Sequence, residues 1–189
     1  MGLKQIEQSE NHKEGESMNT IKTKIIAVVG LLVLLMSAAA AEPPRATTDK
    51  VRKELVTLPY YGVFDNLEYR VDGDTVTLSG QVLRPSTRGD AARRVSKIEG
   101  VNRVINNIEV LPVSQFDDSI RTRAYRAIFR TGGLYRYAMG PNPAIHIIVK
   151  NGNVTLEGAV SSKMDSQLAY MAANRVPGEF AVTNNLRVE

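Results

Sequence analysis

The chain has 189 residues, of which 43% are hydrophobic and 23% are charged, so it can form one or two packed domains. It has no cysteine, which excludes thiolate catalysis, cysteine-based metal centres, disulfides and a lipidated N-terminal cysteine. It has only two histidines and no tryptophan, so we expect no metal and no cofactor. The formal net charge is +4. This composition favours a globular protein without enzymatic activity.

The N-terminal 41 residues have the layout of a secretory signal peptide. Residues 25–41, IIAVVGLLVLLMSAAAA, form an apolar run without a charge, preceded by lysines and closed by alanines. We therefore expect cleavage near Ala41 and release into the periplasm. Met18 is the natural start of the protein. Residues 1–17 then result from a start site assigned too far upstream, or they are an extra polar extension. The alternative is a retained membrane anchor, because a spanning helix needs about 17 apolar residues at least.

The rest of the chain contains an internal repeat. The pattern V-x4-V-T-L-x-G-x-V occurs at 71–82 and again, 78 residues later, at 149–160. The same shift relates further pairs, namely Gly100 and Gly178, Asn106 and Asn184, and Asn107 and Asn185. A register kept over so many residues indicates two copies of one structural unit.

The two copies differ in length upstream of this pattern. Their first helices are related by a shift of 69 residues, so the second copy carries about nine extra residues, within 135–143. We expect one domain at 42–112 and a second domain at 113–189, joined by a short linker.

The hydrophobic pattern of each copy predicts the order helix, strand, strand, helix, strand. The first copy is predicted to contain a helix at 48–58, strands at 67–71 and 76–82, a helix at 86–97 and a strand at 101–110. The second copy is predicted to contain a helix at 118–130, a hairpin that turns at 151–153, a helix at 162–174 and a strand at 180–188. The predicted fold class is α+β, with two consecutive αββαβ domains, each a three-stranded mixed sheet with two helices on one face.

These features resemble the tandem BON domain proteins of the bacterial envelope. The resemblance is carried by the V-T-L-x-G-x-V strand, the glycine after the second helix and V-x-x-V-x-N-N-[IL]-x-V in the last strand. It covers essentially all of the chain after the predicted signal peptide. It implies a non-enzymatic periplasmic protein that supports envelope integrity under stress and binds anionic phospholipid through the first helix of its second domain.

That helix is the most basic segment of the second copy. Arg123, Arg126 and Arg130 are spaced by three and four residues and so lie along one stripe. A guanidinium group can bind a lipid phosphate through two hydrogen bonds, and aromatic rings suit the depth of the headgroups. The predicted lipid-binding residues are Arg121, Arg123, Tyr125, Arg126, Phe129 and Arg130. The alternative reading is an ordinary solvated basic helix face.

Other conspicuous residues are better explained by structure than by chemistry. Gly80 and Gly158 lie in mid-strand and predict close approach of a neighbouring group. The Asn-Asn pairs predict a bulge or turn, because asparagine tolerates irregular backbone. His146 lacks a second histidine or a cysteine nearby, so we expect a surface strand residue.

A second class of function is a protein-binding or chaperone-like stress adaptor, with envelope proteins as partners. A flat apolar patch on the sheet face opposite the helices would favour it, and Tyr69, Ile145 and Ile147 could lie there or in the core. Nucleic-acid binding is not expected, because the chain is exported and its basic surplus is small.

Overall fold

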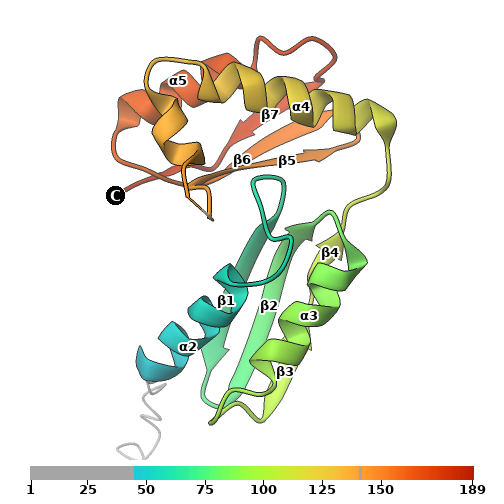
Figure 1. The fold of residues 1–189 in the computed structure, drawn as a ribbon, viewed down its shortest axis with the longest axis vertical. Coiled ribbons are helices and arrows are strands. Elements are labelled where there is room, and N and C mark those ends of the chain that lie inside the picture. The colour runs from blue at the N-terminus through green and yellow to red at the C-terminus, as the bar shows by residue number, and fades with distance from the viewer. Residues whose placement is uncertain (1–44, 141) are drawn as a thin grey trace, which may run out of the picture. The chain divides into compact units, whose positions relative to one another are not determined.

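The computed structural model describes residues 45–140 and 142–189 (Figure 1). The predicted signal peptide at 1–41 lies outside the described residues. The segment Glu42–Glu189 is one compact unit that contains two separate hydrophobic cores, one for each repeat. In the part of the chain that the structure describes, no helix has the length and apolar character needed to cross a membrane.

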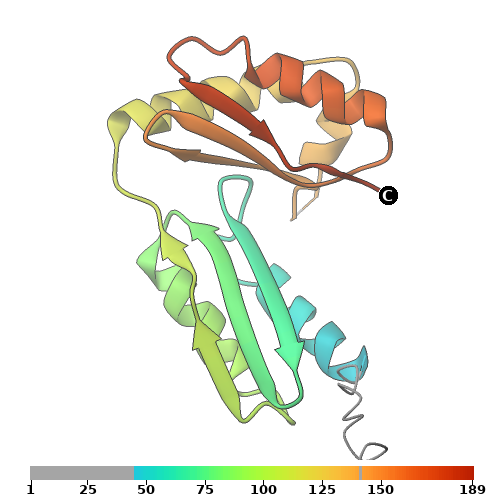
Figure 2. The same ribbon diagram turned by 180° about the vertical axis from the view of Figure 1, so that it is seen from behind.

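The first domain has the predicted order of elements. Its elements are α2 (Arg45–Val56), β1 (Asn66–Asp72), β2 (Thr75–Val82), α3 (Pro85–Val95), β3 (Arg103–Asn106) and β4 (Glu109–Val110). β1 pairs antiparallel with β2, while β3 and β4 pair parallel with the other side of β2. Both helices cover one face of this mixed sheet, and Figure 2 shows the sheet from its other side. The predicted α+β fold is confirmed.

The second domain repeats this arrangement with one addition. Its elements are α4 (Gln115–Phe129), η1 (Leu134–Ala138), β5 (Ile145–Lys150), β6 (Asn153–Val160), α5 (Lys163–Ala173), β7 (Ala181–Asn184) and β8 (Arg187–Val188). β5 pairs antiparallel with β6, and β7 and β8 pair parallel with it. The short 3-10 helix η1 overlaps the region of the insertion, so this part of the extra segment forms a helical turn.

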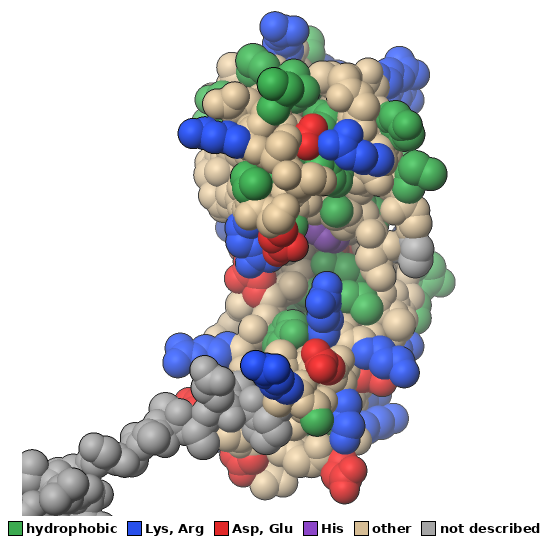
Figure 3. Space-filling model, turned by 90° about the vertical axis from the view of Figure 1, so that its left-hand side faces the viewer, with side chains coloured by type: hydrophobic (Ala, Val, Ile, Leu, Met, Phe, Trp, Pro, Cys, Tyr) green, Lys and Arg blue, Asp and Glu red, His purple; other side chains and the backbone are tan. Residues whose placement is uncertain are grey.

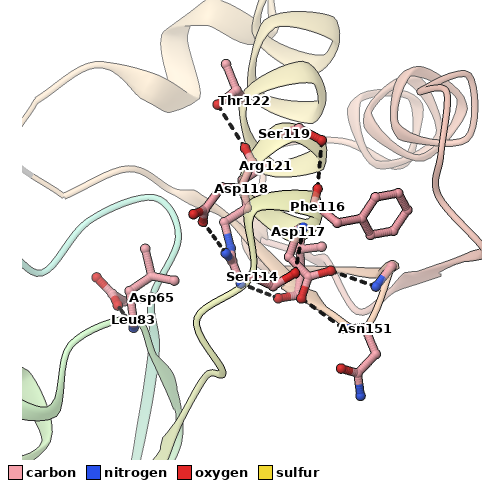
Figure 4. Close-up of polar contacts among 12 residues, drawn as sticks. Asp65, Leu83, Ser114, Phe116, Asp117, Asp118, Ser119, Arg121, Thr122 and Asn151 are labelled. Carbon is pink, nitrogen blue, oxygen red and sulfur yellow. Dashed lines mark hydrogen bonds and ion pairs between the residues drawn. The ribbon is translucent and has the colours of Figure 1, made fainter.

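The helix α4 begins three residues earlier than predicted, because Ser114 caps its N-terminus. The Ser114 hydroxyl accepts a hydrogen bond from the backbone N–H of Asp117 at 3.2 Å. The carboxylate of Asp117 accepts hydrogen bonds from the backbone N–H groups of Asn151 at 3.0 Å and Gly152 at 2.8 Å. These contacts tie the start of α4 to the β5–β6 turn (Figure 4).

The two mid-strand glycines have the predicted packing role. Gly80 and Gly158 have φ angles of +104° and +112°, in the region that favours glycine. A Cβ atom would overlap the carbonyl oxygen of Asn66 at the first position and that of Ala144 at the second. The prediction of close approach is confirmed, because the neighbouring strand passes where a side chain would begin.

The Asn-Asn pairs interrupt the last strand of each domain, as predicted. The side-chain amide of Asn106 donates to the carbonyl of Arg88 in α3 at 3.0 Å, and its oxygen accepts from the N–H of Ile108 at 3.2 Å. Asn184 makes the equivalent bonds to Ser166 in α5 and to the N–H of Leu186, both at 3.2 Å. Each asparagine therefore breaks the strand and fastens it to the second helix.

The apolar strand residues considered for an open sheet face belong to the core. Ile145 and Ile147 are fully buried under the helices of the second domain. Tyr69 packs against the first core, and its hydroxyl donates to the carbonyl of Thr48 in α2 at 3.3 Å. These three side chains therefore form no apolar patch on the opposite face of the sheet.

Candidate functional site

The structure corrects the prediction for Arg121, the first arginine of α4. Its side chain is only 3% exposed, because one guanidinium nitrogen lies 2.6 Å from Asp118 and another donates to the carbonyl of Val149 in β5 (Figure 4). Position 121 directly follows the buried Ile120 and lies three residues before the buried Ala124, so it is on the inner side of the helix. Arg121 fastens α4 to the sheet and does not present a charge at the surface.

Phe129 is also buried, which differs from its predicted place on the exposed face of α4. Its side chain is 8% exposed, and its ring meets that of Tyr125 edge to face with centroids 4.9 Å apart. Tyr125 remains 39% exposed. Tyr125 and Phe129, which are four residues apart, therefore form an aromatic pair with one ring inside and one at the surface.

Arg123 and Arg126 of α4 and Arg130, which caps the C-terminal end of the helix, leave a cationic surface. Arg126 and Arg130 are exposed. Arg123 is half-buried, and its guanidinium donates to the carbonyl of Ser119 at 3.1 Å and to its hydroxyl at 2.6 Å. Within residues 45–140 and 142–189, none of these three makes an ion pair with a carboxylate.

An open groove of about 880 Å³ lies beside the exposed side of α4. Its apolar lining consists of Phe64, Tyr125, Phe129, Tyr135, Ala138 and Met139. Its polar lining consists of Thr122, Arg126 and Arg130. The groove is apolar at its base because aromatic and aliphatic side chains line it. It is positively charged because its lining has two guanidinium groups and no carboxylate.

The insertion in the second domain builds one wall of this groove. The hydroxyl of Tyr137 in η1 donates to the carboxylate of Asp165 at 2.9 Å and accepts from the N–H of Ser161 at 2.9 Å. Arg136 lies 2.7 Å from the same carboxylate, which keeps η1 against the start of α5. Tyr135 and Met139 are left 62% and 66% exposed along the groove.

Asp165 remains charged beneath this wall because several groups donate to it. Hydrogen bonds from the hydroxyls of Ser162 and Tyr137 lower the pKa of Asp165, and the nearby Arg136 lowers it further. From the sequence we did not predict that η1 forms a wall of a groove. The only sign of it in the sequence was the insertion of about nine residues in the second copy.

A loop of the first domain supplies the other wall. The carboxylate of Asp65 shapes the loop by accepting from the N–H groups of Leu83 at 2.7 Å and Gly62 at 3.1 Å. The carbonyl of Val63 accepts from the N–H of Ile147 in β5 at 2.7 Å. Phe64 follows, and its ring meets that of Tyr125 edge to face at 6.2 Å. The rings of Phe64, Tyr125 and Phe129 thus form a continuous aromatic surface.

His146 is buried, so the prediction of a surface strand residue is wrong. It is 8% exposed because the same loop covers it: its Nδ1 lies 3.2 Å from the carbonyl of Gly62, and its ring lies 5.5 Å from that of Tyr61. Burial lowers the pKa of His146, because the charged form would lose its hydration. Among the described residues, no cluster of histidine, aspartate and glutamate side chains is suited to hold a metal ion.

Comparison with known proteins agrees with the fold and its duplication. The sequence profile of the BON domain matches residues 45–112 and 117–189. The chain therefore belongs to the BON domain family, with two copies of the domain in tandem. Membership of this family supports a non-enzymatic role associated with the cell envelope.

Other comparisons add little to this assignment. A search of curated proteins finds no match to the chain. Two solved structures of CdsD, described as a structural protein of the type III secretion system of Chlamydia trachomatis, are remotely similar. The C-terminal domain of CdsD matches with 9% identity and a TM-score of 0.30, over 75% of this chain and 96% of that one. The second structure matches with 10% identity and a TM-score of 0.27, over 76% and 92% of the two chains.

Proposed function

We propose that this tandem BON domain protein is exported to the periplasm, where it binds anionic phospholipid at a membrane surface and supports envelope integrity without catalysing a reaction. The binding element is α4 of the second domain. The observation that carries this proposal is the exposure of Arg126 and Arg130, with no acidic partner among the described residues, beside the exposed ring of Tyr125.

The physical basis is the attraction between guanidinium groups and lipid phosphates. Each basic residue near an anionic membrane contributes about 1 kcal/mol. Arg126 and Arg130 contribute fully, whereas Arg123 is held partly by Ser119. The binding is therefore weak, reversible and sensitive to salt, with Tyr125 placing its ring among the headgroups.

The neighbouring helix α5 extends this surface. Its exposed residues are Lys163, Met164, Gln167, Tyr170 and Met171. Met164 and Met171 are 70% and 46% exposed, and the one carboxylate of the helix, Asp165, is buried. Figure 3 shows one face of the molecule, on which hydrophobic, basic and several acidic side chains are interspersed. The exposed residues of α5 are basic, apolar or uncharged, a composition that suits the interface of an anionic bilayer.

Vesicle sedimentation tests the proposal. The segment Glu42–Glu189, which contains both cores, should bind phosphatidylglycerol vesicles at low salt and phosphatidylcholine vesicles much more weakly. The variant Arg126→Glu/Arg130→Glu should lose at least about 30-fold in affinity, because it removes two favourable charges. The variant Arg88→Glu/Arg103→Glu makes the same change of charge at exposed sites of the first domain and should bind almost normally.

Two outcomes would contradict the proposal. One is equal partitioning to the two kinds of vesicle, and the other is an equal loss of affinity in both double variants. Absence of vesicle binding together with capture of an envelope protein that persists at high salt would favour the adaptor function instead.

A further inference from the structure

We propose that the groove beside α4 binds the alkyl chain of a single-chain anionic amphiphile, such as a fatty acid anion, whose headgroup is held by Arg126 and Arg130. This site would take one molecule from solution. It therefore goes beyond the proposed contact with a membrane surface and does not depend on it.

The base of the groove is suited to a hydrocarbon chain. Phe129 is buried at its base, and the edge-to-face contacts of Tyr125 with Phe129 and Phe64 hold the three rings in place. Aromatic and aliphatic surfaces of this kind favour apolar ligands, because ligand and groove both lose contact with water. The volume of about 880 Å³ lies within the range of roughly 300–1,000 Å³ that is common for small-molecule sites.

The charge of the groove selects the headgroup. Arg126 and Arg130 lie one helical turn apart in the lining, and the lining contains no acidic residue. Guanidinium groups bind carboxylate or phosphate oxygens through charge-assisted hydrogen bonds. An anion at one end of a hydrocarbon chain therefore matches both halves of the groove, whereas a free inorganic anion would leave the apolar half empty.

Most of the groove belongs to the second domain, and the first domain contributes Phe64 to its lining. One wall comes from the insertion, which has no counterpart in the first domain, and the bonds of Tyr137 hold this wall in place. At the position 69 residues before Phe129, the first domain has Tyr60, which lies beyond the end of α2, is 71% exposed and stacks against Arg84. The groove therefore depends on features that the second copy has and the first copy lacks.

The methionines provide direct reporters of binding. The compact unit Glu42–Glu189 contains three methionines: Met139 in the groove, and Met164 and Met171 on α5. We would label their methyl groups with 13C and titrate the unit with dodecanoate below its critical micelle concentration. The Met139 signal should shift and saturate, while the other two signals stay in place.

Two further probes separate the contributions of chain and charge. Dodecyltrimethylammonium has the same chain with the opposite charge and should bind at least about tenfold more weakly, the loss expected when one charged hydrogen bond disappears. Acetate has the charge without the chain and should leave Met139 unshifted. Equal affinity for the two amphiphiles, a shift with acetate, or a common shift of all three methyl signals would overturn the inference.

Matched variants test the location of the site. Thr122→Trp fills the groove and should abolish the Met139 response, whereas Gln167→Trp on α5 should not. Tyr135→Ser removes part of the exposed wall and should weaken binding severalfold, while Tyr170→Ser should have no effect. If Thr122→Trp and Tyr135→Ser, both folded, bind dodecanoate normally, the groove is not the site.

This design separates the groove from the proposed membrane contact. Thr122→Trp keeps Arg126 and Arg130, so it should still sediment with phosphatidylglycerol vesicles. Vesicle binding without any dodecanoate response would overturn the groove and leave the membrane function standing. A saturating Met139 response without vesicle binding would support the groove and contradict the membrane function.

Discussion

Arg121 and Asp118 form an ion pair of 2.6 Å across one turn of α4, in which the arginine is buried and the aspartate is exposed. A second guanidinium nitrogen of Arg121 donates to the carbonyl of Val149 in β5. Arg126 and Arg130, on the outer side of the same helix, make no such ion pair among the described residues. The helix therefore uses the same type of side chain for two purposes, attachment to the sheet and charge at the surface.

Replacement of Arg121 should affect stability rather than binding. Arg121→Leu should lower the free energy of unfolding by about 1–3 kcal/mol, because the buried carbonyl of Val149 loses its charged donor. Arg126→Gln should change it by no more than about 0.5 kcal/mol and should weaken vesicle binding instead. Urea unfolding and sedimentation of the two variants would measure this difference. Wild-type stability in Arg121→Leu would show that the buried pair does not support the fold.

The glycines in mid-strand should tolerate no side chain. Gly158→Ala should lower the free energy of unfolding by more than about 2 kcal/mol, because it adds a Cβ at a positive φ angle and against the carbonyl of Ala144. Gly89→Ala is the control, since Gly89 lies in α3 with open space around it. It should be neutral or stabilise the protein by up to about 1 kcal/mol. Equal effects in urea unfolding would contradict this account.

Mild acid should weaken the contact around His146. Burial lowers the pKa of His146 in the folded protein, so the unfolded chain takes up the proton first as the pH falls through about 6.5. The free energy of unfolding should therefore decrease between about pH 7.5 and 5.5, until the pKa of the folded state is reached.

The control for this prediction is His146→Gln in the segment Glu42–Glu189, where His146 is the sole histidine. Its stability should depend much less on pH in the same interval. Burial raises the pKa of Asp65, so this carboxyl contributes to the pH dependence with the opposite sign, and it is present in both proteins that are compared. Equal pH dependence in the two proteins would show that His146 is not responsible.

Loss of the Tyr137 hydroxyl should loosen the groove wall. Tyr137→Phe removes the hydrogen bonds to Asp165 and Ser161 while keeping the ring, so the free energy of unfolding should fall by about 1–2 kcal/mol. Amide hydrogen exchange should increase in η1 and remain unchanged in α2. Unchanged exchange in η1 would mean that other contacts hold the insertion.

Much of the fold could be predicted because its signals are local. The alternation of Val76, Leu78 and Val82 indicates a strand, and Gly80 indicates close approach within it. Its repetition 78 residues later predicts a second domain of the same kind. Such patterns depend on the periodicity of one segment and on the backbone preferences of glycine and asparagine, which are properties of neighbouring residues.

The site depended on contacts between segments that are distant in the sequence. Arg121 and Arg126 have the same chemistry, and only the packing of α4 on β5 decided that the first turns inward. His146 became buried because a loop more than 80 residues earlier covers it. The groove likewise required Phe64 and the insertion to meet beside Phe129. The sequence alone therefore determined the repeated αββαβ units and the basic character of α4, while the tertiary structure decided which charges and rings reach the surface, because burial is set by whatever distant segment packs against a residue.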